Sequence, residues 1–167
     1  MRIMGIDPGL AIVGFGIIDL DVRKVKVVDY GTIQTDNSLC YTDRLLCVGN
    51  SLEKILKIYQ PDVVAIEELF FNKNSKTAFA ISQVRGVIIY TVLKKEIPLY
   101  EYTPLQVKQG VVGYGRATKN QVQLMVKNLL NLKEIPKPDD AADGLAVALC
   151  HKNFLRSNGI NLQGVVK

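Results

Sequence analysis

Four acidic side chains are the residues of this sequence best suited to chemistry. Asp7 and Glu67 each follow directly on a short apolar run, and an acid at the end of a buried strand is costly unless a cation pairs with it. Asp140 and Asp143 are three residues apart, a spacing that places both carboxylates on one face of a helix. If the fold brings the four together, a divalent metal ion is the natural counter-charge, and ligands that are all oxygen favour Mg²⁺ or Mn²⁺.

Such a cluster would be suited to cutting nucleic acid. Two divalent ions about 4 Å apart can hold both the attacking and the leaving oxygen of a phosphodiester. Each acid also has an ordinary explanation when it is taken alone. Asp7 precedes Pro8-Gly9 and can cap that turn, while acids near the start of a helix interact favourably with the helix dipole. The dipole explains Asp139 better than Asp143, which lies a turn further into the helix.

The composition predicts one globular domain with a proper hydrophobic core. The chain has 167 residues, of which 48% are hydrophobic and 22% are charged. We expect residues 1–156 to form a single domain and residues 157–167 a frayed C-terminal tail. The first apolar run is interrupted at Asp7, unlike a signal peptide, and no apolar stretch approaches the length of a membrane span. Three cysteines at no metal-like spacing and a single histidine, His151, disfavour a zinc site and indicate a reduced, cytoplasmic protein.

Basic residues are concentrated in the middle of the sequence. Residues 69–131 contain nine Lys or Arg and only two acids, Glu96 and Glu101, whereas the rest of the chain has 12 basic and 14 acidic side chains. A basic segment beside a mildly acidic remainder favours a surface that binds a polyanion such as nucleic acid. The alternative is an ordinary solvated surface of lysines.

The pattern of apolar residues predicts an α/β fold with a mixed, five-stranded sheet flanked by helices. Three consecutive Val- and Ile-rich runs predict an antiparallel meander, after which helices and strands alternate until three closing helices. The expected strands cover residues 2–7, 12–20, 24–35, 63–66 and 98–102. The expected helices cover residues 42–59, 75–95, 104–109, 118–130 and 139–155.

This order of elements predicts where the acids meet. If the first strand pairs with the fourth, Asp7 and Glu67 end neighbouring strands. A final helix packed across them can deliver its two aspartates to the same point, and Ala141 and Ala142 keep that helix slim. The helix at 75–95 is apolar nearly all round, so it needs two partners, of which one is the sheet and the other can be a second subunit.

Taken in order, a set of short motifs resembles the RuvC family of Holliday junction resolvases. The resemblance runs from about Met1 to His151, and although any one motif is weak alone, the ordered set is very specific. The motifs are GIDPG at residues 5–9, AIEE at 65–68 with Phe70, KN at 73–74, QVRGV at 83–87, QVKQGVVGYG at 106–115, KNQVQLMV at 119–126 and DAAD at 140–143.

The resemblance implies a ribonuclease-H-like fold and a homodimer that cuts four-way DNA junctions with Mg²⁺, at two ions per subunit and with Mn²⁺ able to substitute. It implies paired nicks in two strands of like polarity during recombination and repair, beside the RuvA–RuvB branch-migration complex. The family's metal-binding acids fall on Asp7, Glu67, Asp140 and Asp143, its active-site lysines on Lys108 and Lys119, and its phenylalanine near the strand exchange point on Phe70.

The basic middle segment also supplies candidate DNA contacts. An aromatic ring can stack on an unpaired base, and of the adjacent Phe70 and Phe71 we assign that contact to Phe70, while one of the two can belong to the core. Contacts to the DNA backbone are expected from Lys73, Asn74, Lys76, Arg116 and Lys127. Lys108 and Lys119 can also have a simpler role than catalysis, in which they bind a phosphate group or are exposed to solvent.

Three residues leave questions open. Arg85 lies in the apolar helix and can be a buried structural partner instead of a DNA contact. Glu68 stands where some relatives in the family have an uncharged residue, and it alters the local charge. Gly144 replaces a more usual Ala, and we expect it to loosen the helix slightly.

Other functions fit parts of this pattern. ATP-binding domains of the actin and sugar kinase type also begin with G-I-D-x-G, but they need two such halves, for which 167 residues leave no room. A non-catalytic junction-binding protein and another ribonuclease-H-like nuclease are the remaining alternatives. An ATPase assay and an RNA–DNA hybrid substrate separate these functions.

Overall fold

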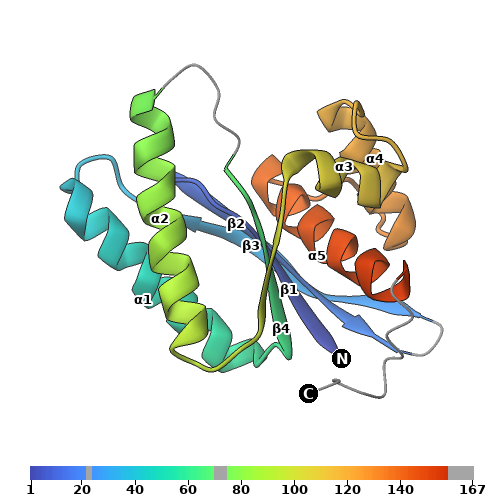
Figure 1. Ribbon diagram of the computed structural model, residues 1–167, viewed down its shortest axis with the longest axis horizontal. Helices are drawn as coiled ribbons and strands as arrows, with labels where there is room; N and C mark the ends of the chain where they lie inside the picture. The colour runs from blue at the N-terminus through green and yellow to red at the C-terminus, as the bar shows by residue number, and fades with distance from the viewer. Residues whose placement is uncertain (22–23, 70–74, 158–167) are drawn as a thin grey trace.

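One mixed β-sheet lies between two layers of helices in the computed structural model (Figure 1). The structure describes residues 1–21, 24–69 and 75–157. The sheet has five strands, so the predicted α/β class with a five-stranded mixed sheet is confirmed. The expected C-terminal tail lies, apart from its first residue, outside the described residues.

The central strand of the sheet is β1 (Arg2–Asp7), and the strand order is β3-β2-β1-β4-β5. On one side, β1 pairs antiparallel with β2 (Ile12–Leu20), which pairs antiparallel with β3 (Val25–Gln34). On the other side, β1 pairs parallel with β4 (Val63–Glu67), which pairs parallel with β5 (Leu99–Tyr102). The expected pairing of the first strand with the fourth is therefore present.

The helices divide between the two faces of the sheet. Helices α1 (Tyr41–Tyr59) and α2 (Ser75–Leu93) pack on each other over one face. Helix α5 (Asp139–Ser157) lies directly on the opposite face, and α3 (Pro104–Val112) and α4 (Lys119–Leu129) pack against α5 (Figure 1). None of the helices in the described part of the chain is long and apolar enough to span a membrane.

Burial on both faces explains the continuous apolar run in β1. Ile3 packs into the core on the α5 side, whereas Met4 and Ile6 pack into the core on the α1 and α2 side, and all three side chains are fully buried. A strand covered on one face only would alternate apolar and polar residues. The two cores thus hold β1 firmly and fix the position of its last residue, Asp7.

Helix α5 sits on glycines of the sheet. A Cβ atom on Gly14 would lie 1.9 Å from the carbonyl oxygen of Asp140, and one on Gly5 would lie 2.2 Å from that of Gly144. A Cβ on Gly144 itself would lie 2.6 Å from the carbonyl carbon of Phe15. The sequence interpretation credited this close approach to Ala141 and Ala142 and expected Gly144 to loosen the helix. In the structure, missing side chains on both partners let α5 lie against the backbone of β1 and β2.

The predicted elements are all present, and their boundaries differ from the prediction by at most three residues. Helix α5 continues two residues beyond the predicted end, to Ser157, and α2 ends two residues earlier, at Leu93. Helix α3 continues from the expected Gln109 to Val112, where Gly113 adopts the left-handed conformation, with φ of 93°, and ends the helix. These differences leave the predicted acids at the ends of their elements.

Candidate active site

The ends of β1 and β4 bring the first two acids together. Because the strands are parallel neighbours and Ile6 is in register with Ile66, the following residues Asp7 and Glu67 leave the sheet side by side. Their side chains form a hydrogen bond with each other. The prediction that Glu67 stands next to Asp7 is therefore met by the fold.

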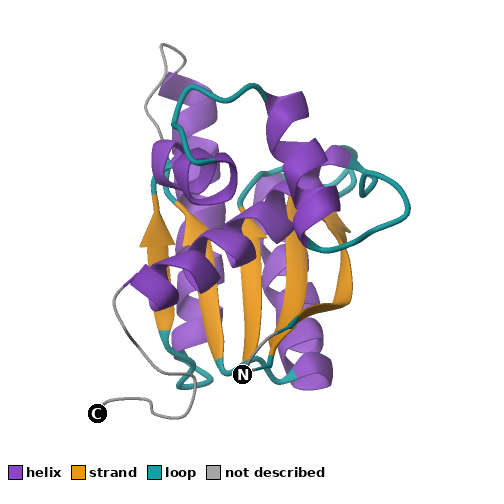
Figure 2. Ribbon diagram, turned by 90° about the vertical axis from the view of Figure 1, so that its right-hand side faces the viewer, coloured by secondary structure: helices purple, strands orange, loops and turns teal. Residues whose placement is uncertain are grey.

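The first turns of α5 bring the other two acids to the same place. Figure 2 shows α5 running obliquely across the strands. The Asp140 backbone lies on Gly14 of β2, and both Asp140 and Asp143 are close enough to act electrostatically on the Asp7 carboxyl group. Three elements that are far apart in the sequence thus contribute carboxylates to one region.

Asp7 and Glu67 have an unusually high affinity for protons. Burial, followed by the neighbouring carboxylate of Glu67, raises the pKa of Asp7 to about 9, and the charges of Asp143 and Asp140 add to the effect. Burial also raises the pKa of Glu67, although the hydrogen bond with Asp7 and the charge of Lys108 oppose it. Without a cation, Asp7 and Glu67 therefore share a proton at neutral pH.

Lys119 is the cation that faces the helix aspartates. Its Nζ lies 3.0 Å from Oδ2 of Asp143 and 3.6 Å from Oδ2 of Asp139. Burial acts to lower the pKa of Lys119, but the hydrogen bond and charge of Asp143, with the charges of the neighbouring aspartates, raise it above its usual value. Burial raises the pKa of Asp143 in spite of this partner. One lysine thus compensates only part of the negative charge.

The two lysines reach the cluster from α3 and α4. Both helices begin with a capping box, formed by Thr103 with Gln106 in α3 and by Thr118 with Gln121 in α4. Lys119 is the first residue of α4. Lys108, which is half-buried on α3, is close enough to Glu67 to lower the pKa of that carboxyl group.

The carboxylate oxygens of the four acids are ligands of the kind that a hard divalent cation prefers. In this structure, however, their side chains are not arranged around a common metal position. In the part of the chain that the structure describes, no group of three or more His, Cys, Asp or Glu side chains is arranged to hold a metal ion. The hydrogen bonds give the reason, because Asp7 is engaged with Glu67 and Asp143 with Lys119. To bind these acids, Mg²⁺ or Mn²⁺ would have to displace the proton shared by Asp7 and Glu67 and the ammonium group of Lys119 at Asp143.

The structure describes some of the predicted DNA contacts. Arg116 is exposed in the loop between α3 and α4, and Lys127 is half-buried on α4. Phe70, Lys73 and Asn74 lie outside the described residues. Lys76 lies in the first turn of α2, where the structure does not describe its side chain.

Other residues have structural partners that the sequence left open or did not indicate. Arg85 forms an ion pair with Glu101 on β5, as expected of a structural partner. The backbone N–H of Glu68 donates to the carbonyl oxygen of Tyr102 at 2.7 Å and extends the pairing of β4 with β5. Tyr114, whose hydroxyl donates to Gln121, was not singled out from the sequence. In the sequence, the capping pattern Thr118-x-x-Gln121 was the signal that could have indicated the start of α4, where Tyr114 binds Gln121.

Comparison with known proteins places these features in one family. The family model "Crossover junction endodeoxyribonuclease RuvC" matches residues 3–151. A crossover junction endodeoxyribonuclease RuvC of Caldicellulosiruptor saccharolyticus is 60% identical over 152 residues, which cover 90% of this chain and 92% of the relative. The RuvC of Ruminiclostridium cellulolyticum is 55% identical over 160 residues and 96% of both chains.

A solved structure agrees with the sequence comparison. The structure of Thermus thermophilus RuvC in complex with a Holliday junction substrate superposes with a TM-score of 0.88 at 32% identity, and the match covers 95% of this chain and 96% of that one. The shared fold is the ribonuclease-H-like fold that the family resemblance implied. The match extends from β1 to α5 and so includes all three elements that carry the four acids. The chain therefore belongs to the RuvC family of crossover junction endodeoxyribonucleases.

Proposed function

We propose that this chain resolves four-way DNA junctions by hydrolysing phosphodiester bonds with Mg²⁺ held by Asp7, Glu67, Asp140 and Asp143. The endodeoxyribonuclease activity on Holliday junctions follows from membership of the RuvC family and from the likeness to the junction-bound T. thermophilus protein. The observation that carries the metal assignment is the convergence of the ends of β1 and β4 and the start of α5, where burial and the other carboxylates raise the pKa of Asp7. A group of acids this poorly compensated favours a divalent cation.

The proposed cofactor is two Mg²⁺ ions per subunit, with Mn²⁺ able to substitute. Bound Mg²⁺ would lower the pKa of a water molecule and balance charge on the departing oxygen of the phosphodiester. Asp7, at the end of the central strand, is the residue that both neighbouring elements approach. We assign it the central position among the metal ligands.

The basic residues have two proposed roles. Lys119 and Lys108, which face the carboxylates from α4 and α3, stabilise the negative charge that develops on the phosphate during attack. Phe70 stacks on a base near the strand exchange point. The DNA backbone is held by Lys73, Asn74, Lys76, Arg116 and Lys127.

A homodimer supplies the two sites that paired nicks require, and helix α2 is the proposed interface. Phe79, Tyr90 and Leu93 lie on one side of α2 and are 70%, 68% and 55% exposed. A Cβ on Gly86, on the same stripe, would meet no atom within 4 Å, so a partner helix has room to approach closely. The RuvA–RuvB complex is a further partner proposed by analogy with the family, and the cytoplasmic location stays a prediction.

Incubation of a labelled four-way junction with the protein and Mg²⁺ tests the proposal. The wild type is expected to give symmetric nicks in two strands of like polarity, whereas Asp7→Asn is expected to bind the junction without nicking it. Wild-type cutting by Asp7→Asn would refute the assignment of Asp7. Binding by the wild type without nicks in either Mg²⁺ or Mn²⁺ would instead indicate a non-catalytic junction-binding protein.

A further inference from the structure

The loop between α3 and α4 is closed by a side-chain hydrogen bond. The hydroxyl of Tyr114 donates to Oε1 of Gln121 at 3.0 Å. The same oxygen accepts from the backbone N–H and the hydroxyl of Thr118, at 2.8 and 3.1 Å. Three donors therefore converge on one oxygen within the first turn of α4, the turn that begins with Lys119.

The start of α3 provides a comparison within the same molecule. Its capping glutamine, Gln106, accepts from the backbone N–H and hydroxyl of Thr103 at 2.8 and 3.0 Å, the same two contacts. Among the described residues, the tyrosine donor is the addition made at α4. Because a capping box alone is sufficient to start α3, the additional bond has a role other than forming the helix.

Fold stability does not account for the tyrosine either. Tyr114 is 46% exposed, so its hydrogen bond buries little surface and adds little to the stability of the whole fold. The loop is already fixed by other contacts: Gly113 N–H donates to Gln109 O at 2.9 Å, and Ala117 is 2% exposed. The remaining consequence of the bond is the exact placement of the first turn of α4.

Lys119 is the residue that depends on this placement. Its side chain is long and 52% exposed, and it contacts Asp143 at 3.0 Å across the boundary between α4 and α5. The flexible stem of a lysine gives little orientation of its own, so the position of the backbone decides where the ammonium group lies. A misplacement of about 1 Å in a catalytic group can reduce a reaction rate considerably.

We propose that Tyr114 is a positioning residue for junction cleavage, whose hydroxyl holds the first turn of α4 so that Lys119 lies against Asp143. The inference deepens the proposed function and rests on it, because it assumes that Lys119 acts in cleavage. Tyr114 itself touches neither the acids nor, in this role, the DNA. Its contribution passes through Gln121 and the backbone of α4.

The variant Tyr114→Phe removes the hydroxyl and keeps the ring. In single-turnover cleavage of a four-way junction, we expect the rate to fall about threefold to tenfold, the effect of losing one orienting hydrogen bond. The dissociation constant for the junction is expected to stay within about twofold. Tyr59→Phe is the matched control, because it removes a hydroxyl bond to Asp29 on the α1 side of the sheet, opposite to the side that carries α4 and α5, and its cleavage rate should not change.

A double-mutant cycle isolates the dependence on Lys119. In the Lys119→Ala background, Tyr114→Phe should change the cleavage rate by less than about twofold, since the group that it positions is absent. An equal reduction in both backgrounds would overturn the proposal. So would weaker binding with an unchanged cleavage rate, which would make Tyr114 a DNA contact, or wild-type cleavage by Lys119→Ala.

Hydrogen exchange provides a readout that does not involve cleavage. Tyr114→Phe is expected to speed exchange of the backbone N–H of Gln121 and its neighbours in the first turn of α4, and to leave the first turn of α3 unchanged. Unchanged exchange in α4 would refute the proposal whatever the cleavage rates. Failure of the wild type to cut junctions, with faster exchange in the variant, would instead reject the proposed function and leave the structural link intact.

Discussion

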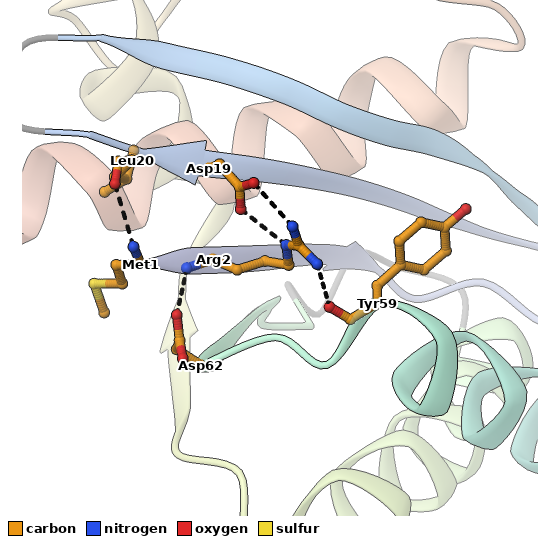
Figure 3. Close-up of polar contacts among 6 residues, drawn as sticks. All are labelled: Met1, Arg2, Asp19, Leu20, Tyr59 and Asp62. Carbon is orange, nitrogen blue, oxygen red and sulfur yellow. Dashed lines mark hydrogen bonds and ion pairs between the residues drawn. The ribbon is translucent and has the colours of Figure 1, made fainter.

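The two ends of β1 differ in whether the acidic side chains there are paired with cations. At the first residue, Nε and Nη2 of Arg2 bind the two carboxylate oxygens of Asp19 at 2.8 and 2.9 Å (Figure 3). Nη1 of Arg2 donates to the carbonyl oxygen of Tyr59 at 2.6 Å, and its backbone N–H donates to Asp62. The hydrogen bond from Arg2 lowers the pKa of Asp19. This end joins β1, β2 and the end of α1 with its charges compensated.

At the last residue of the strand, the acids outnumber the cations. Asp7 holds a proton that it shares with Glu67, and its pKa is raised to about 9. Lys119 compensates Asp143, but no arginine in the described residues forms an ion pair with Asp7 or Glu67. The comparison separates an acid that stabilises the fold, Asp19, from acids whose burial lowers the stability of the fold, Asp7 and Glu67. The second kind marks the place where a cation from outside is needed.

Replacing Asp7 gives the largest expected effect and tests the comparison directly. Asp7→Asn should reduce junction cleavage in Mg²⁺ by at least about a hundredfold, because a ligand of the proposed metal is lost. The same variant should raise the free energy of unfolding of the metal-free protein by about 1–3 kcal/mol, since a costly buried carboxyl group is removed. Urea unfolding and single-turnover cleavage measure the two quantities. A variant that loses both stability and activity would show that Asp7 supports the fold.

The glycines under α5 give the next effect. Gly14→Ala should lower the free energy of unfolding by about 2–4 kcal/mol, because its Cβ would lie 1.9 Å from the Asp140 carbonyl oxygen and α5 would have to move. Cleavage should fall as well, since Asp140 moves with the helix. The matched control is Gly31→Ala in β3, where the Cβ would meet only the ring of Phe15 at 3.2 Å and the change should stay within about 1 kcal/mol. Equal losses at both glycines would contradict the seating of α5.

These two predictions show what the sequence could and could not give. The sequence interpretation took the pairing of β1 with β4 as a condition, and this pairing, which the structure contains, is sufficient to place Glu67 beside Asp7. The close approach of α5 to the sheet was expected, but the glycines that permit it were missed, because a glycine in a strand indicates closeness to another backbone only when the packing partner is known. The contact of Lys119 with Asp143 was missed for a similar reason, since it depends on how α4 packs on α5.

The pH dependence of stability provides a smaller effect that belongs to one end of β1 only. Asp7 has a folded pKa of about 9, above its usual 3.8, so the metal-free protein binds more protons when folded and should become less stable as pH rises between these values. The expected slope is about 1 kcal/mol per pH unit between pH 7 and 8.5, measured in chelator by urea unfolding. Asp7→Asn should flatten the slope.

The choice of this pH window excludes Asp19 and His151 as the titrating groups. The lowered pKa of Asp19 gives stability that is fully present above 3.8 and is lost only as pH falls through the lowered value. The buried His151, whose pKa burial lowers to about 4, affects stability only below its usual 6.5. A slope that persists in Asp7→Asn would therefore place the titrating group elsewhere, with Glu67 and Asp143 as the next acids to replace.

Breaking the compensated end of β1 should have the smallest effect. The side chains of Arg2 and Asp19 are 33% and 39% exposed, so Arg2→Met is expected to lower the free energy of unfolding by only about 1 kcal/mol. Junction cleavage should not change, because the strand places Arg2 about 17 Å from Asp7. Arg2→Lys keeps the charge but not the bidentate geometry and should recover part of the loss. If Arg2→Met reduced cleavage as Gly14→Ala does, the ends of β1 would be coupled, and the carboxylates at Asp7 could no longer be treated separately from the ion pair that anchors the strand.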